Sequence, residues 1–118
     1  MRAKQSKVCL LSGGEVTVTV RNGGVGGRNQ QFALACAEKI EGEDITILSA
    51  GTDGVDGNSP AAGAIVDGFT VVRAGGIPQV REALARFDAH PLFAHLGDAI
   101  ITGPTGNNLR DLRILLAV

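Results

Sequence analysis

Seven polar residues of this sequence could bind a substrate, hold a metal ion or move a proton, and they lie in four short segments. Each segment lies at a predicted strand end or helix start. The residues are Glu15, Arg28, Asn29, Asp53, Asp56, Thr105 and Asn108. Carboxylates bind cations and accept protons, whereas guanidinium, amide and hydroxyl groups donate hydrogen bonds to anions. A site for an organic acid or a phosphate is therefore the chemistry to consider.

Arg28 and Asn29 follow the glycine-rich segment 22–27 and open a predicted helix. Such a turn exposes backbone N–H groups, and the helix N-terminus adds about half a positive charge, so an anion could be held there beside Arg28. The segment fits neither G-x-G-x-x-G nor G-x-x-x-x-G-K-[ST], so it contains neither a dinucleotide fingerprint nor a P-loop. The alternatives are an ordinary turn and a surface arginine.

Asp53 follows the apolar run 44–50, which is predicted to be an interior strand. Open α/β sheets place ligand-binding groups at the carboxyl ends of such strands, so Asp53 could hold a metal ion or accept a proton. A calcium loop is a poor fit, because Asp53 and Asp56 are three positions apart instead of two and no glutamate closes the loop. For Glu15, the alternative is an ordinary carboxylate at a strand edge.

The composition indicates one compact domain that neither binds nucleic acid nor crosses a membrane. The chain has 118 residues, 44% of them hydrophobic, and a formal net charge of −1, whereas nucleic-acid binders carry a clustered basic excess. It has no apolar run long enough for a membrane span and no signal-peptide core at the N-terminus. Cys9 and Cys36 lack the spacing of a metal or redox motif. We therefore expect a cytoplasmic protein with two reduced thiols.

The hydrophobic pattern predicts an α/β fold, a single domain in which helices pack on a mixed β-sheet. Predicted strands cover 7–11, 16–21, 44–50, 61–67, 98–102 and 112–118, and predicted helices cover 28–40, 78–87 and 91–96. A tight turn at 12–14 is expected to join the first two strands. The run 44–50 is typical of a strand covered on both faces. Residues 1–6 are expected to be disordered.

Five ordered blocks of the sequence resemble one known family. They are LLSGGEVTVTV, GGRNQQFALA, LSAGTDGVDG, AAGAIVDG and LGDAIITGPTGNNLRDL. The sequence is similar to the MOFRL domain, the C-terminal domain of glycerate kinases of the glycerate 2-kinase type, which are often named hydroxypyruvate reductases. The resemblance implies a larger N-terminal Rossmann-like domain, with the active site in the cleft between the two domains. It also implies phosphorylation of D-glycerate to 2-phosphoglycerate with ATP and Mg²⁺.

The resemblance assigns roles at the matching positions. The catalytic candidates are Glu15 of SGGE, Arg28 of GGRNQ, Asp53 of AGTDG and Asn108 of TGPTGNN. The substrate-binding candidates are Arg28, Asn29, Thr105 and Asn108. Arg28 would bind the glycerate carboxylate or a phosphate, and Asp53 would orient the metal ion or accept the hydroxyl proton. Asn108 and Glu15 would hold substrate hydroxyls or a partner side chain.

The resemblance also implies a catalytic lysine and most nucleotide contacts from the N-terminal domain, since the lysines here are only Lys4, Lys7 and Lys39. We therefore expect no kinase turnover from the chain alone, which needs that domain on the same or a separate chain. Its small ligand is expected to be an organic acid such as glycerate. The surface left without its partner is expected to favour a homo-oligomer. The sequence departs from the family pattern at Gln31, Pro60, Phe87, Asn107 and Arg110.

Two other functions stay open. The chain could be part of an NAD(P)-dependent hydroxypyruvate reductase, although it lacks G-x-G-x-x-G. It could also be a non-catalytic binding or assembly module that kept the fold and lost the chemistry.

Overall fold

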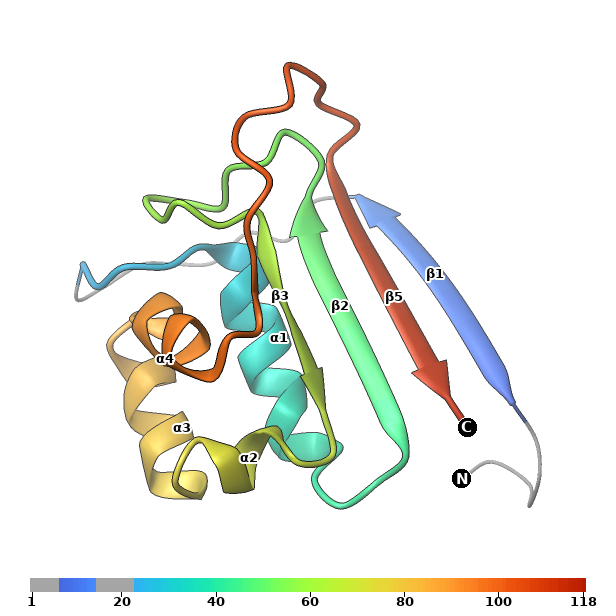
Figure 1. Cartoon of the computed structure of the whole chain (residues 1–118), viewed down its shortest axis with the longest axis vertical. Coiled ribbons are helices and arrows are strands. Elements are labelled where there is room, and N and C mark those ends of the chain that lie inside the picture. Colours follow the sequence, from blue (N-terminus) through green and yellow to red (C-terminus); the bar gives the residue numbers. More distant parts are fainter. Residues whose placement is uncertain (1–6, 15–22) are drawn as a thin grey trace.

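The computed structural model describes residues 7–14 and 23–118, which form one sheet with helices packed on it (Figure 1). The elements, in chain order, are β1 (Val8–Gly14), α1 (Arg28–Lys39), β2 (Ile45–Gly51), β3 (Gly63–Asp67), α2 (Thr70–Arg73), α3 (Ile77–Ala85), α4 (Ala89–Leu96), β4 (Ala99–Ile100) and β5 (Asp111–Ala117). The strand order is β1-β5-β2-β3-β4. The single-domain α/β fold with helices on a sheet is confirmed.

All neighbouring strands in the described ranges pair antiparallel, where the sequence favoured a mixed sheet. The position of β5 explains the difference. β1 and β2 are joined through α1 and run parallel to each other, but β5 lies between them and runs antiparallel to both. Val8 thus pairs with Ala117, from opposite ends of the chain. Hydrophobic periodicity reports which residues are strands and does not report such distant partners.

The predicted turn at 12–14 is wrong, because these residues continue β1. Gly14 pairs with Asp111, so the partner of β1 is β5. The predicted strand 16–21 lies outside the described residues.

The other predicted elements correspond to observed ones, although β4 (Ala99–Ile100) is much shorter than the strand predicted over 98–102. The predicted helices 28–40, 78–87 and 91–96 correspond to α1, α3 and α4, and the predicted strands 44–50, 61–67, 98–102 and 112–118 correspond to β2, β3, β4 and β5. The segment that follows β3, to which no element was assigned above, contains the short helix α2. Among the described residues, no helix is both long enough and apolar enough to cross a membrane.

The hydrophobic core lies between α1 and the central strands β2 and β3. Its members include Ala33, Leu34, Ala37, Ile47, Val66, Val80 and Phe93. The two alanines let α1 approach the sheet closely, because they add little bulk between helix and strand. Burial of a side chain the size of Leu34 stabilises the fold by about 2 kcal/mol. This packing fixes where the N-terminus of α1 lies relative to the strand ends.

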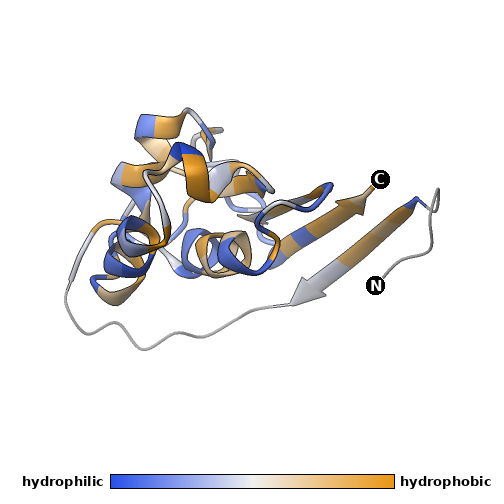
Figure 2. Ribbon diagram, turned by 90° about the horizontal axis from the view of Figure 1, so that it is seen from below, coloured by the Kyte–Doolittle hydropathy of each residue, from blue (hydrophilic) through white to orange (hydrophobic). Residues whose placement is uncertain are grey.

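Exposed hydrophobic side chains lie on the face of the sheet that α1 does not cover. The register places Leu11, Ile114, Leu48 and Ile65 in one row across four strands of that face. Leu11 is 70% exposed, and Leu116, on the same face of β5, is 46% exposed. Figure 2 shows β1 and β5 extending beyond the helices with hydrophobic residues along them. The sequence predicted that both faces of β2 would be covered, but the described helices cover one face of the sheet. The other face, called the open face below, nevertheless has the composition of a covered one.

Candidate functional site

Two loops and the start of α1 meet at one end of the sheet, at the top of Figure 1. One loop follows β2 and the other, 101–110, precedes β5. Thr52 donates its N–H (3.0 Å) and its hydroxyl (2.7 Å) to the Arg110 carbonyl, and its hydroxyl oxygen accepts the Leu109 N–H at 2.7 Å. The two loops are therefore tied together. These loops and the first turn of α1 are called the rim below.

Arg28 is held on the rim by a buried carboxylate. Its Nε lies 2.7 Å from Asp111 Oδ2, and its Nη2 lies 2.9 Å from Asp111 Oδ1. The Arg28 side chain is 34% exposed, whereas the Asp111 side chain is fully buried. Such a bidentate, charge-assisted pair fixes the plane of the guanidinium. The first residue of α1 and the first residue of β5 are thereby locked together.

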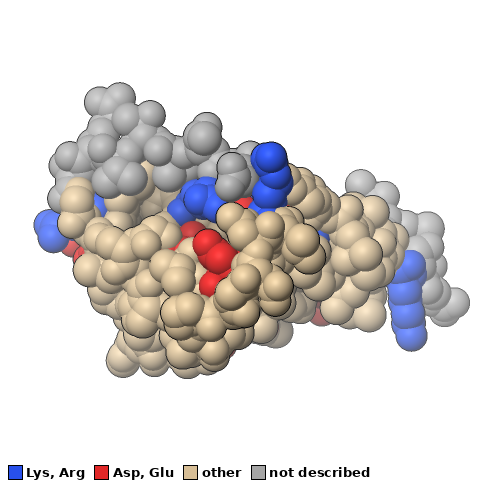
Figure 3. Space-filling view, turned by 90° about the horizontal axis from the view of Figure 1, so that it is seen from above, with Lys and Arg blue, Asp and Glu red and all other residues tan. Residues whose placement is uncertain are grey.

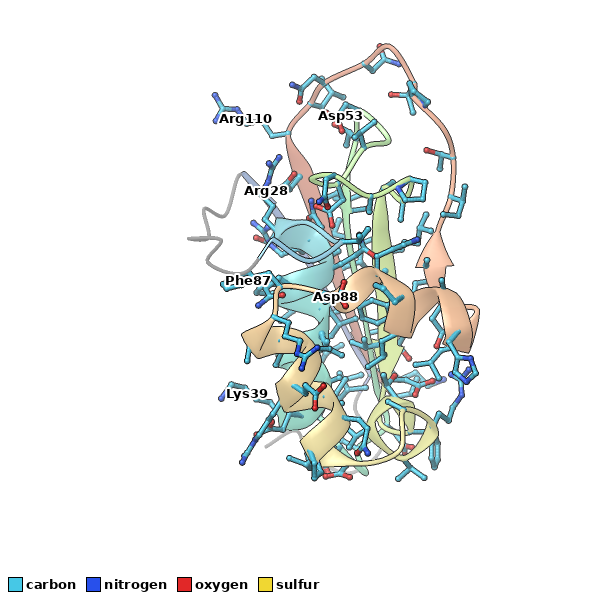
Figure 4. All side chains as sticks on the ribbon, turned by 90° about the vertical axis from the view of Figure 1, so that its left-hand side faces the viewer. Arg28, Lys39, Asp53, Phe87, Asp88 and Arg110 are labelled. Carbon is cyan, nitrogen blue, oxygen red and sulfur yellow. The ribbon has the colours of Figure 1, made fainter. Side chains whose placement is uncertain are left out.

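Three polar side chains converge where Gly51 has no side chain. A Cβ atom at Gly51 would lie 3.1 Å from Asp53 Oδ1, 3.6 Å from Asn29 Nδ2 and 3.6 Å from Asp111 Oδ1. These groups come from the loop after β2, from α1 and from β5, respectively. The structure therefore brings together Asn29, Asp53 and, through Asp111, Arg28, which are far apart in sequence. Figure 4 shows Arg28 and Asp53 at this same end of the molecule.

The N-terminus of α1 is capped by Asp56. One carboxylate oxygen accepts the Asn29 N–H (2.9 Å) and the Asn29 Nδ2 group (3.2 Å). The other accepts the Gln30 N–H (2.8 Å) and the Gln30 Nε2 group (3.1 Å). The anion at this helix start is thus the chain's own carboxylate, so the expectation that these N–H groups hold an external anion is wrong. Asp56 faces the helix, and the calcium-loop alternative therefore has no support.

The glycines beside this cap allow two loops to touch. A Cβ on Gly27 would overlap the Asp56 carboxylate, and a Cβ on Gly57 would overlap the Gly26 carbonyl oxygen. Gly57 also has a φ of 61°, which side-chain-bearing residues rarely adopt. The glycine-rich segment therefore allows its backbone to lie close to the loop that contains Asp56 and Gly57. This favours an ordinary turn over an anion-binding loop.

Asn29 and Gln30 belong to a buried hydrogen-bond network. The Asn29 Oδ1 accepts the Ser49 hydroxyl at 2.8 Å. Gln30 Nε2 donates to Asp56 and, at 2.8 Å, to Ser59, so Gln30 Oε1 must be the acceptor of its pair with His90 Nδ1 at 3.0 Å. His90 therefore carries its proton on Nδ1. This network anchors the first turn of α1, and the structure places Asn29 inside it.

Thr105 and Asn108 lie in the exposed loop 101–110. Thr105 donates its N–H to the Asp53 carbonyl at 3.0 Å, and its hydroxyl donates to the Thr52 carbonyl at 2.7 Å. Asn108 Oδ1 accepts the Arg110 N–H at 3.0 Å. Both residues therefore shape the rim next to Asp53. Glu15 lies outside the described residues.

Sequence reasoning missed Asp111, the partner that orients Arg28. Its signal was weak, because Asp111 follows Arg110 at the start of a strand and resembles an exposed charge. Only the pairing of β5 with β2, which sets Asp111 opposite Gly51, brings it to the rim.

The carboxylates of the rim differ in what they could still bind. Asp111 accepts the Arg28 fork and Asp56 accepts four hydrogen bonds, whereas Asp53 accepts the Val55 N–H at 3.1 Å through Oδ1. The described ranges contain no group of three or more Cys, His, Asp or Glu side chains placed to hold a metal ion. Figure 3 shows acidic and basic side chains side by side at this end of the molecule. The Asp53 carboxylate by itself could serve as a ligand for Mg²⁺, because this ion commonly binds one or two carboxylates together with substrate phosphates.

Residues 8–111 match the MOFRL family, so the chain belongs to that family, as its sequence motifs indicated. It is 43% identical to a D-glycerate 2-kinase of Thermotoga maritima over 120 residues, covering 99% of this chain and 28% of that protein. It is also 43% identical over 112 residues to a protein of Agrobacterium vitis provisionally named hydroxypyruvate reductase, covering 91% of this chain and 29% of that protein. The crystal structure of a glycerate kinase from Thermotoga maritima superimposes with a TM-score of 0.84 at 45% identity, covering 93% of this chain and 27% of that one. The chain thus spans less than a third of the length of each of these relatives.

Proposed function

We propose that this chain is the C-terminal, substrate-side domain of an ATP-dependent glycerate 2-kinase, which converts D-glycerate to 2-phosphoglycerate. The observation that carries the proposal is the Arg28 guanidinium, clamped by Asp111 beside Asp53, in a chain 43% identical to a D-glycerate 2-kinase. A guanidinium beside a carboxylate suits a substrate that carries both a carboxylate and a hydroxyl group.

The rim residues have separate roles in this reaction. Arg28 binds the glycerate carboxylate or a phosphate, and Asp111 orients it. In one of two alternative roles, Asp53 accepts the proton of the glycerate C2 hydroxyl. The hydroxyl oxygen then bonds to the γ-phosphorus of ATP as the bond between that phosphorus and ADP breaks. Thr105 and Asn108 shape the substrate side of the rim, and Asn29 positions the first turn of α1.

In the alternative role, Asp53 would hold a magnesium ion together with phosphate oxygens. When bound, it would neutralise charge on the transferring phosphoryl group. Since Asp53 cannot be both a firm metal ligand and an effective proton acceptor, the two roles give opposite expectations. If Asp53 is a metal ligand, the Asp53→Asn variant should need a higher Mg²⁺ concentration for activity. If Asp53 is the proton acceptor, the turnover of Asp53→Asn should be low at every Mg²⁺ concentration.

The nucleotide contacts come from a separate domain in this proposal. Lys39, the last residue of α1, lies about 17 Å along the helix axis from Arg28, its first residue. Lys7 precedes β1 at the end of the sheet opposite the rim. Neither of these two lysines can reach a phosphoryl group beside Arg28, and Lys4 lies outside the described residues. The chain alone therefore binds substrate without turning it over, and the partner is the N-terminal domain of a glycerate kinase. Because ATP is the co-substrate, we place the reaction in the cytoplasm.

The test is a coupled assay of ADP release with D-glycerate and ATP. It compares the chain alone with a chimera in which the chain replaces the matching part of the Thermotoga maritima kinase. We expect turnover only from the chimera, and a loss of at least about a hundredfold on Arg28→Ala. Arg86→Ala, at the exposed residue that follows α3, is the matched control. Robust turnover by the chain alone would overturn the need for a partner, and a folded but inactive chimera would overturn the kinase proposal.

A hydroxypyruvate reductase is the second candidate, favoured by the name of the Agrobacterium vitis relative. The same chimera distinguishes it. Oxidation of NADH or NADPH with hydroxypyruvate, without glycerate phosphorylation, would identify a reductase. Glycerate binding with neither reaction would identify a non-catalytic binding module.

A further inference from the structure

Arg110 has an unfavourable backbone conformation at the rim. Its φ is 69°, and Phe87 is the other non-glycine residue with a positive φ in the described ranges. An arginine gains nothing from the left-handed region, because its Cβ crowds the backbone there. Such strain persists only where the surroundings enforce it, and it is commonest at functional sites.

Three hydrogen bonds enforce this conformation. The Arg110 N–H donates to Asn108 Oδ1 at 3.0 Å. The Arg110 carbonyl accepts both the N–H and the hydroxyl of Thr52, at 3.0 and 2.7 Å. These partners hold the backbone with no contribution from the arginine side chain. A glycine or an asparagine would fit the same backbone with less strain, so the bonds explain how the strain is tolerated and do not explain why an arginine is there.

The guanidinium of Arg110 is exposed and has no hydrogen bond or ion pair with the described residues. The backbone that carries it is nevertheless fixed by residues next to the site. Thr52 adjoins Asp53, and Asp111, the next residue, holds Arg28. Figure 4 shows Arg110 and Arg28 extending toward the same side of this end of the molecule.

The net charge of the rim side chains indicates a role for the Arg110 guanidinium. Arg28 binds Asp111, and the Asp111 and Asp53 carboxylates both lie beside Gly51, so these three side chains together carry a net negative charge. An anionic ligand would be repelled by that balance. Arg110 adds a positive charge at this end of the molecule and has no carboxylate partner of its own among the described residues.

We propose that Arg110 is an anion-binding residue that contacts the phosphoryl oxygens of the phosphorylated ligand. This inference rests on the proposed function, because it takes 2-phosphoglycerate as the product. The planar fork of arginine suits a phosphoryl group, and its charge acts more strongly on a phosphate ester than on a singly charged carboxylate. Arg28 then serves the carboxylate, and the two guanidinium groups divide the two ends of the ligand.

The experiment titrates the 118-residue chain with 2-phosphoglycerate and with D-glycerate, followed by NMR shifts of the rim amides. It compares the wild type with Arg110→Gly, Arg110→Asn and Arg110→Lys, and uses Arg86→Ala as the control. We expect Arg110→Gly and Arg110→Asn to weaken 2-phosphoglycerate binding about tenfold and glycerate binding much less. Arg110→Lys should recover part of the loss, because it keeps the charge and loses the fork.

Thermal unfolding of the same variants separates binding from folding. Relief of the positive φ should leave the Tm of Arg110→Gly unchanged or raised while affinity falls, an outcome that a purely structural arginine cannot give. The inference is overturned if 2-phosphoglycerate affinity stays within about twofold of wild type. It is also overturned if both ligands weaken equally, or if the wild type shows no saturable shifts at millimolar 2-phosphoglycerate. If Arg110→Gly keeps full affinity for 2-phosphoglycerate and the chimera with the Thermotoga maritima kinase is active, only this inference is rejected.

If Arg110→Gly loses affinity tenfold and the chimera is inactive, the proposed kinase function is rejected and the anion-binding role of Arg110 is kept.

Discussion

Asp56 binds Asn29 twice, through the backbone N–H at 2.9 Å and through the side-chain Nδ2 at 3.2 Å. With the two matching bonds to Gln30, one carboxylate caps the first turn of α1 from a loop that is distant in sequence. The negative charge lies at the positive end of the helix dipole, where it is stabilised. Arg28 begins the same turn, so its direction depends on this cap.

Replacement of Asp56 should therefore destabilise the fold. Asp56→Ala leaves four buried donors without their acceptor, and we expect the free energy of unfolding to fall by about 3–5 kcal/mol. Urea denaturation measures the change. Asp44→Ala, at an exposed position before β2, is the control and should shift unfolding by less than about 0.5 kcal/mol. Equal effects of the two substitutions would mean that the cap contributes nothing.

A side chain at Gly27 should disturb the same cap by a different route. Gly27→Ala places a methyl group on the Asp56 carboxylate, so one of the two loops must move. We expect a loss of about 1–3 kcal/mol in unfolding free energy. Gly13→Ala is the control, because its Cβ would meet only the Asp111 carbonyl oxygen, at an ordinary 3.8 Å. Similar melting temperatures for the two variants would contradict the close approach of these loops.

Loss of the Asp111 charge should affect ligand binding more than it affects folding. Asp111→Asn keeps the shape of the side chain but weakens its hold on the Arg28 fork, so we expect D-glycerate affinity to fall about tenfold. Calorimetric titration or NMR shifts would measure this. Asp98→Asn removes an ion pair with Arg73, outside the rim, and is the control. Wild-type affinity in Asp111→Asn would show that Arg28 is positioned without its buried partner.

The two thiols should differ in reactivity. Cys9 is exposed on β1, whereas burial raises the pKa of the half-buried Cys36 thiol, with Lys39 opposing the shift in part. The thiolate is the reactive form, so a disulfide reagent near neutral pH should modify Cys9 in Cys36→Ser at least severalfold faster than Cys36 in Cys9→Ser. A raised pKa favours the folded state below the ordinary pKa of a thiol. That contribution is lost as the pH rises through the folded-state pKa of Cys36. Equal modification rates at all pH values would contradict this burial.

Local patterns in the sequence predicted the elements well where packing follows local periodicity. Phe32, Cys36 and Ile40 recur every four residues and defined α1 to within one residue of its observed end. The apolar run at the C-terminus likewise defined β5. These signals work because one helix or strand face must be buried against the rest of the chain.

Contacts between distant segments could not be predicted in the same way. Ser12–Gly14 looks like a turn because glycine is permissive, yet pairing with β5 extends the strand through it. Asp56 looks like a loop carboxylate, and its role as a cap depends on how the loop after β2 folds over α1. Asp111 reaches Arg28 only because β5 inserts between β1 and β2. In the candidate site, Arg28, Asn29, Asp53 and Asp56 were named from the sequence, whereas Asp111 and the role of Asp56 as a cap were not.

The open face has a practical consequence for anyone who prepares this domain by itself. Leu11, Leu112 and Leu116 expose apolar surface to water, which is unfavourable. During refolding from denaturant, such surfaces on two molecules would associate with each other. Leu11→Lys and Leu116→Lys would place charges on this face away from the rim, which makes them a natural choice for concentrated samples.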